Sequence, residues 1–180
     1  MRICIIWRTA YLTSMTRIRI LSLLTCVLFV LYARAQTSLD KAQLKNLRGS
    51  MVSFSSLTQK DTLILVCFWS TSSDESVSEL NAINANYEKW KRAVPFHMMA
   101  VSADEGMDAN KVRPYVNMNG WKFDVFTDVN GDLRTALNSK AIPQTIILKD
   151  GKVLFLQSGF SSGGEHFLLE KLKALAAGKS

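Results

Sequence analysis

The sequence predicts an α/β fold in which a central mixed β-sheet is flanked by helices. Residues 63–69 form an apolar run with the length and composition of a strand that is buried on both faces. A helical pattern follows within a few residues, and strand-like and helical segments then alternate along the chain. Lys149-Asp-Gly-Lys152, between two strand-like runs, is typical of a β-hairpin. The chain length is that of a single domain.

The helix after residues 63–69 is expected at 74–91. Ser72 and Glu75 have the spacing of a capping box, and Asp74 and Glu75 suit the positive end of the helix dipole. Apolar residues then recur every three or four positions, as they do along the buried stripe of a helix. These residues are Val77, Leu80, Ile83, Tyr87 and Trp90. Strand and helix together predict the start of a βα unit.

The neighbouring segments extend this pattern. Residues 36–48 are polar with scattered leucines and are interpreted as an entry segment, whereas residues 49–56 predict a short edge strand. Residues 95–102 predict a second buried strand. Residues 107–118 have a helical period, and Pro114 either opens the regular part of this helix or kinks it.

The C-terminal part continues the alternation after a stop at Asn119-Gly120. Three more strands are predicted at 123–127, 144–148 and 153–157. Two more helices are predicted at 133–137 and 165–177. The last helix is amphipathic and is expected to place four apolar residues on one side: Phe167, Leu168, Leu172 and Leu175. The resulting order from residue 63 onward is β-α-β-α-β-α-β-β-α.

The junction between the first buried strand and its helix resembles the active-site segment of thioredoxin-like proteins, in particular the envelope thiol–disulfide oxidoreductases of the TlpA/ResA type. Those proteins carry Phe-Trp-Ala-Thr-Trp at the end of an apolar strand, then Cys-Gly-Pro-Cys at the start of a helix. Phe68, Trp69 and Thr71 match in register, whereas the two cysteine positions fall on Ser73 and Ser76. The resemblance implies a thioredoxin scaffold without the redox-active cysteine pair.

The resemblance covers residues 49–177 and implies a thioredoxin fold with an N-terminal β extension and an inserted βα unit. Its second specific segment is Ala141-Ile-Pro-Gln-Thr145. Thioredoxin-like proteins carry a cis-proline there, and the backbone before it pairs with substrate peptides, so the resemblance implies a cis-proline at Pro143. It also implies a peptide-binding groove formed by Trp69, Ser73, Ile142 and Pro143.

Residues 1–35 have the pattern of a secretory signal peptide. A basic region precedes a mostly apolar stretch at 20–32, and Ala33-Arg34-Ala35 is a typical cleavage site. We therefore expect an exported protein, located in the periplasm or cell envelope, whose single domain spans residues 36–180. An uncleaved signal anchor is the alternative and would be the only contact with a membrane. Met15 is a second candidate for the translation start.

Charge and cysteine content change once this leader is set aside. Five of the 22 basic residues lie in the leader, which contains no acid, so the rest of the chain has 17 basic and 15 acidic residues. This near balance does not favour a nucleic-acid partner. Cys4 and Cys26 also belong to the leader. Cys67 is then the only thiol of the mature chain, and no intramolecular disulfide can form.

The candidate reactive residues are one thiol and two hydroxyls. Cys67 falls within a predicted buried strand, where a thiol has a raised pKa and little access to solvent. Ser73 and Ser76 would need an adjacent base to act as nucleophiles, but the two histidines, His97 and His166, fall on a strand and on the last helix. We therefore interpret the serines as helix-capping residues.

No metal or other cofactor is predicted. Asp128-x-Asn130-x-Asp132 begins like a calcium loop, but Leu133 and Ser139 stand where that loop requires a glycine and an acid, so a turn with a helix cap is expected. Copper binding would need thiolates or a compact group of methionines and histidines. The methionines instead fall at core-like positions: Met98, Met99, Met107 and Met118.

Three functions are compatible with these observations. The preferred one is a redox-inactive, chaperone-like module that binds a peptide or protein of the envelope by β-augmentation. The second is thiol–disulfide oxidoreductase or peroxidase-like activity through Cys67, which would need an external thiol. The third is a structural subunit of an envelope assembly. Enzyme activity is not expected, because the resemblance places serines at both cysteine positions.

Overall fold

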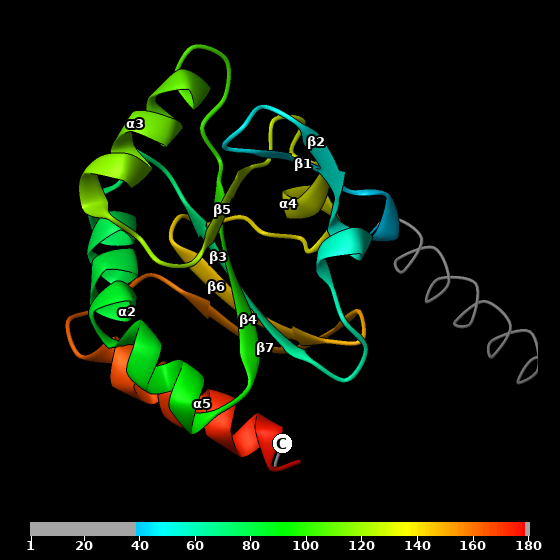
Figure 1. The fold of residues 1–180 in the computed structure, drawn as a ribbon, viewed down its shortest axis with the longest axis vertical. Coiled ribbons are helices and arrows are strands. Elements are labelled where there is room, and N and C mark those ends of the chain that lie inside the picture. Colours follow the sequence, from blue (N-terminus) through cyan, green and yellow to red (C-terminus); the bar gives the residue numbers. More distant parts are fainter. Residues whose placement is uncertain (1–38, 179–180) are drawn as a thin grey trace, which may run out of the picture. The chain divides into compact units, whose positions relative to one another are not determined.

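The computed structural model describes residues 39–178, so the predicted leader lies outside the described residues. Seven strands form one mixed sheet in the order β2-β1-β5-β4-β3-β6-β7 (Figure 1). β3, β4 and β5 are parallel, and the other neighbouring pairs are antiparallel. The strands are β1 (Gln43–Asn46), β2 (Met51–Ser53), β3 (Leu63–Trp69), β4 (Phe96–Ser102), β5 (Asp124–Thr127), β6 (Gln144–Lys149) and β7 (Lys152–Ser158).

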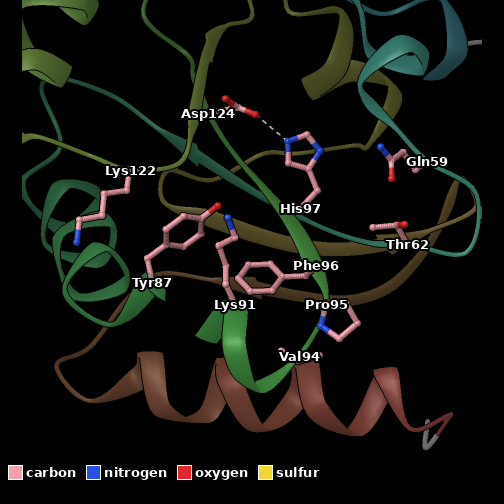
Figure 2. A pocket seen from close by; sticks show the side chains of 10 residues that line it. All are labelled: Gln59, Thr62, Tyr87, Lys91, Val94, Pro95, Phe96, His97, Lys122 and Asp124. Carbon is pink, nitrogen blue, oxygen red and sulfur yellow. Dashed lines mark hydrogen bonds and ion pairs between the residues drawn. The ribbon is translucent and has the colours of Figure 1, made fainter. Parts of the chain in front are cut away.

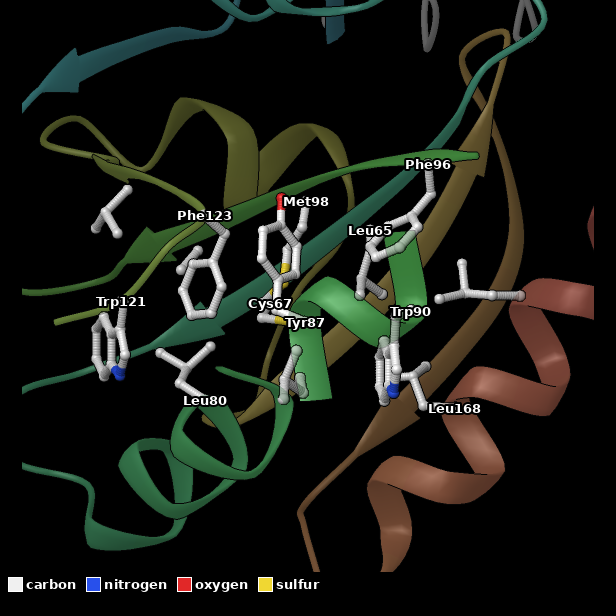
Figure 3. Close-up of a cluster of buried hydrophobic side chains, with 14 of the residues drawn as sticks. Leu65, Cys67, Leu80, Tyr87, Trp90, Phe96, Met98, Trp121, Phe123 and Leu168 are labelled. Carbon is white, nitrogen blue, oxygen red and sulfur yellow. The ribbon is translucent and has the colours of Figure 1, made fainter. Parts of the chain in front are cut away.

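Helices cover both faces of the sheet. The helices are α2 (Asp74–Ala93), α3 (Ala109–Asn119), α4 (Asp132–Ala136) and α5 (Gly164–Ala176), together with the short 3-10 helix η1 (Phe54–Leu57). Side chains of α2, α3 and α5 belong to one buried cluster, of which Figure 3 shows the part around Trp90 and Leu168. Side chains of α4 and η1 belong to a second buried cluster. None of the helices in the described part is both long and apolar enough to span a membrane.

β3 contributes to both clusters, which explains why its sequence is uninterruptedly apolar. Leu65, Cys67 and Trp69 lie in the cluster with α2, whereas Val66 and Phe68 lie in the other cluster. All seven residues of β3 are buried. A strand covered on both faces needs no polar alternation. The predicted α/β class, the order of elements from β3 onward and the mixed sheet are confirmed.

The region before β3 differs from the prediction. Gln43–Asn46, interpreted from the sequence as part of an entry segment, is strand β1, and it forms a hairpin with β2. Leu44 is its one buried residue, so the strand has too few apolar positions for a visible pattern. The Asn46 side chain instead fixes the turn, because its Oδ1 accepts the backbone N–H groups of Arg48 and Ser50, both at 3.0 Å.

Three smaller expectations are also corrected. Phe167 is 55% exposed, and Leu169 takes the place that was predicted for it on the buried side of α5. Met107 and Met118 are exposed rather than in core positions. Pro114 does not open α3 but lies inside it, whereas the predicted stop is confirmed, because Gly120 caps α3 in the left-handed conformation.

Candidate functional site

The candidate site lies where β3 ends and β6 begins. These strands are antiparallel, with Phe68 opposite Gln144, so the loop after β3 and the segment before β6 meet at the same edge of the sheet. The Ile142–Pro143 peptide bond is cis, which confirms the sequence prediction for Pro143. The fold thus places Ser73, at the start of α2, and Pro143 at one end of the sheet.

Ser73 and Ser76 act in the first turn of α2. The residue that caps the helix is Ser73 rather than Ser72, because its Oγ accepts the Ser76 N–H at 3.2 Å. The Ser76 hydroxyl is buried and lies 2.8 Å from the Ser73 carbonyl oxygen, to which it donates. The predicted capping box is therefore wrong, since Glu75 instead accepts the backbone N–H of Phe160. The capping role expected for these serines is confirmed for the Ser73 hydroxyl only, because the Ser76 hydroxyl lies against carbonyl oxygens of the preceding loop rather than accepting a helix N–H.

Asp104, which the sequence analysis did not single out, holds the loop between β3 and α2. Its buried carboxylate accepts hydrogen bonds from the hydroxyls of Ser70 (2.7 Å), Thr71 (3.0 Å) and Ser102 (2.8 Å). It also accepts the Thr71 backbone N–H at 3.0 Å. Because Asp104 follows β4, these bonds tie the end of β4 to the residues that precede Ser73.

A second missed acid, Glu79, lies beneath this loop. Its side chain is 2% exposed, and its Oε1 accepts the Thr145 hydroxyl at 2.7 Å. The same hydroxyl is 3.5 Å from Cys67 Sγ, but a hydroxyl has one proton, and the shorter contact is with the carboxylate. The position could have been found from sequence, because Glu79 is three residues after Ser76 and four before Ile83, on the inward side of α2.

Burial dominates the electrostatics of this group. It raises the pKa of the Glu79 carboxyl from 4.5 to about 7, against the opposing effect of the Thr145 hydrogen bond and with a small contribution from Glu75. Burial, reinforced by the charge of Glu79, raises the pKa of the Cys67 thiol well above 9.0. Glu79 can therefore hold or release a proton near neutral pH, whereas Cys67, fully buried, stays a protonated thiol.

The predicted groove residues differ in their accessibility. Trp69 is fully buried and packs edge-on against Trp121, with ring centroids 4.7 Å apart, so its side chain does not line a surface groove. Side chains alternate between the two faces of β3, and Trp69 lies on the same face as Cys67 and Leu65, in the core. Ser73 and Ile142 are partly exposed, whereas Pro143 is buried, so only two of the four predicted groove residues reach the surface. The Pro143 carbonyl accepts the Gly159 N–H at 2.9 Å, whereas the N–H and C=O of Ile142 have no bond to any described residue.

The histidines lie away from the two serines. His97, at the start of β4, lines a separate cavity of about 570 Å³ (Figure 2), whereas Ser102 marks the other end of the same strand, next to Trp69. The His97 Nε2 lies 2.9 Å from an Asp124 carboxylate oxygen. His166 is in α5. Neither histidine forms a hydrogen bond with Ser73 or Ser76, so no histidine base is paired with a serine at the start of α2.

The acidic turn before α4 is a helix cap. The Asp128 carboxylate is buried and accepts the backbone N–H groups of Leu133 (3.2 Å) and Arg134 (2.8 Å). These are N–H groups of the first turn of α4, which have no partner within the helix. The sequence interpretation of a turn with a helix cap is confirmed.

Comparison with solved structures finds thioredoxin-like proteins. The solution structure of an uncharacterized thioredoxin-like protein from Porphyromonas gingivalis is 34% identical with a TM-score of 0.67, and covers 77% of this chain and 92% of its own. A secreted disulfide oxidoreductase from Mycobacterium tuberculosis, homologous to E. coli DsbE, is 14% identical with a TM-score of 0.58 (79% and 98% covered).

A third similar structure is the bacterioferritin comigratory protein of Xanthomonas campestris, which was studied for alkyl peroxide reduction. It is 18% identical with a TM-score of 0.65, and covers 78% of this chain and 95% of its own. No curated protein sequence matches the chain. The AhpC/TSA family pattern matches residues 35–155, which is more than half of the chain. Family match, thioredoxin-like fold and structural neighbours agree, and the chain belongs to the AhpC/TSA family.

Proposed function

We propose that this chain is an exported, TlpA-type thioredoxin-like protein that lacks the cysteine pair and binds an extended segment of an envelope protein. In this proposal Ser73 and Ser76 stand at the two cysteine positions, and the groove is formed by Ser73 and Ile142, next to the buried Pro143. The observation that carries the proposal is the peptide group of Ile142. Ile142 is a partly exposed residue, and its N–H and C=O lack partners among the described residues, so they could pair with an added strand.

The proposed lack of redox activity rests on which groups occupy the start of α2. Disulfide exchange requires an attacking thiolate and a second thiol to resolve the mixed disulfide. Ser73 and Ser76 offer only hydroxyls: the Ser73 hydroxyl caps the helix, and the Ser76 hydroxyl donates to the Ser73 carbonyl oxygen. Cys67 is buried, and its raised pKa keeps it protonated.

Export is proposed from the leader pattern of residues 1–35. One structurally similar protein, the Mycobacterium tuberculosis disulfide oxidoreductase, is described as secreted. N-terminal sequencing of the protein from its native host tests this part, because cleavage after Ala35 would leave a chain that begins at Gln36.

A matched pair of variants tests binding by the groove. Ile142→Pro removes the backbone N–H that an added strand would use, whereas Ile142→Ala shortens the side chain and keeps the N–H. The probe is a carboxymethylated, permanently unfolded protein, and binding is followed by fluorescence anisotropy. We expect Ile142→Pro to weaken binding about fivefold relative to Ile142→Ala, which corresponds to one backbone hydrogen bond. Absence of binding by the unmodified protein, or equal affinity of two folded variants, would contradict the proposal.

The second candidate function is thiol chemistry at Cys67. It is favoured by the family match and by the structural similarity to a secreted disulfide oxidoreductase, although Cys67 itself is buried and protonated. Insulin reduction with dithiothreitol distinguishes the two functions. Our proposal predicts no rate above the uncatalysed reaction. Catalysis that disappears in Cys67→Ala would establish the second function. If the protein shows no binding and no catalysis, the result would favour the third function, a structural subunit.

A further inference from the structure

A small basic cavity is lined by residues of the β1–β2 turn and of the start of α3. Figure 1 shows these elements, with β1 and β2 at one edge of the sheet. Its volume is about 230 Å³. Lys45 and Thr127 form its floor, because they are directly opposite each other in the β1–β5 ladder and therefore share one face of the sheet. Arg48 contributes from the turn and Arg113 from α3. The cavity is separate from the site at the end of β3.

The charge of this basic cavity has one sign. Three cationic residues line it, Lys45, Arg48 and Arg113, and no aspartate or glutamate does. None of the three forms an ion pair with a described carboxylate. Asp108, the acid just before α3, is instead paired with Lys111 at 2.6 Å. Three uncompensated cations around one cavity repel one another, and a bound anion would remove that repulsion.

Thr127 adds an independent indication of a ligand. Its side chain is only 6% exposed, yet its hydroxyl has no hydrogen-bond partner among the described residues, and the residue lines the cavity. Other buried hydroxyls of the sheet are bonded, for example those of Ser102 and Thr145. The Thr127 hydroxyl oxygen is not among the fully enclosed atoms that lack a partner, so it can be reached from the cavity and can donate to an acceptor bound there.

We propose that the basic cavity binds a phosphate group. Two guanidinium groups can each form paired hydrogen bonds with an oxyanion, and Lys45 adds a point charge. The Thr127 hydroxyl would be a neutral donor. Ala109, the first residue of α3, lines the same cavity, and its backbone N–H has no partner among the described residues, whereas the Asn110 N–H is bonded to the Met107 carbonyl. A volume of about 230 Å³ suits a phosphate group with a small substituent better than a drug-sized ligand.

Isothermal titration of the purified protein with inorganic phosphate, at ionic strength held constant with sodium chloride, tests this site. We expect saturable binding that Arg48→Gln and Arg113→Gln each weaken about tenfold, the effect of losing a charge-assisted hydrogen bond. Thr127→Val removes one neutral donor and should also weaken binding. The matched control is Lys122→Gln, which removes an equal charge at the other cavity and should leave the affinity unchanged.

Vesicles distinguish a free phosphate from a lipid headgroup. Binding to vesicles that contain phosphatidylglycerol, without a response to inorganic phosphate and with the same losses in Arg48→Gln and Arg113→Gln, assigns the phosphate to a lipid and supports the site. Binding to neither ligand would overturn the proposal. Two further results would overturn it: Lys122→Gln weakening binding as much as the arginine variants do, or a folded Thr127→Val binding with unchanged affinity. Both are expected if the anion is attracted only non-specifically by the positive charge of the protein.

Discussion

Replacing Glu79 with glutamine is expected to stabilise the protein, and by an amount that depends on pH. The carboxyl is 2% exposed, and burial raises its pKa from 4.5 to about 7. Glutamine has nearly the same shape but cannot ionise, and its side-chain oxygen can accept the same hydrogen bond from the Thr145 hydroxyl. The substitution therefore removes the charge and leaves the packing in place.

The sign follows from which state holds the proton. Between pH 4.5 and 7 the folded protein keeps the Glu79 proton, whereas the unfolded chain releases it, so the free energy of unfolding falls as pH rises. The loss is complete above pH 7 and amounts to about 3 kcal/mol, at about 1.4 kcal/mol per pKa unit. Glu79→Gln should therefore equal the unmodified protein at pH 4 and exceed its stability by up to about 3 kcal/mol at pH 8.

Urea unfolding, followed by the fluorescence of the buried tryptophans Trp69, Trp90 and Trp121, measures this difference between pH 4 and 8. Comparing variant with parent cancels other titrating groups, such as Asp128, whose pKa is also raised by burial. Glu88→Gln, an exposed position on the same helix, is the control and should show no pH-dependent gain. A Glu79→Gln difference that stays constant from pH 4 to 8 would refute the account of a buried, protonated carboxyl.

Two further predictions concern the first turn of α2. Ser73→Ala should lower the free energy of unfolding by about 1 kcal/mol because it removes the helix cap. Ser72→Ala, whose exposed hydroxyl bonds only to the loop residue Ser70, should cost clearly less in the same urea experiment, and equal costs would contradict the assigned cap. Ser73→Cys combined with Ser76→Cys should form a disulfide under mild oxidant, seen as a loss of two mass units from the paired thiols. Thiols that stay unpaired in the folded protein would contradict the proposed correspondence with the family's cysteine pair.

The sequence predicts those parts of the fold in which burial is visible as a pattern. β3 could be recognised because both of its faces are covered, and α2 because its apolar stripe runs over several turns. β1 could not, because its single buried side chain, Leu44, leaves no periodicity to detect. An edge hairpin is specified by its turn, and the Asn46 hydrogen bonds that fix this turn depend on three-dimensional geometry.

The candidate site was predicted less completely than the fold. The match to the family's sequence pattern located Ser73 and Pro143 at the site, but it could not predict which side chains are accessible to solvent. Trp69 was expected in the groove, and its alternation in β3 instead directs it into the core. Glu79 was missed because a helical stripe is recognised by its apolar members, so an acid on the buried side is read as a solvent-facing residue. The burial of Glu79 follows from tertiary packing against β6, where Thr145 lies.

Several buried polar atoms at this end of the sheet bear on the choice between a binding module and a structural subunit. The Trp69 Nε1 and the Gln144 Oε1 are buried without a partner among the described residues. Trp69 is the last residue of β3 and Gln144 the first of the neighbouring strand β6, next to Pro143. Glu79 adds a carboxyl whose burial costs about 3 kcal/mol above pH 7. A fold that served only as a scaffold would be more stable with a glutamine at position 79, and the helix cap, which uses Ser73 and Ser76, does not require an acid there. Local departures of this kind are typical of functional sites, where stability is given up for another role. Three other buried side-chain atoms without a partner, at Arg134, Ser139 and Glu165, lie outside β3 and β6, so it is Glu79 and the unbonded Ile142 peptide group that favour a binding site over a purely structural role.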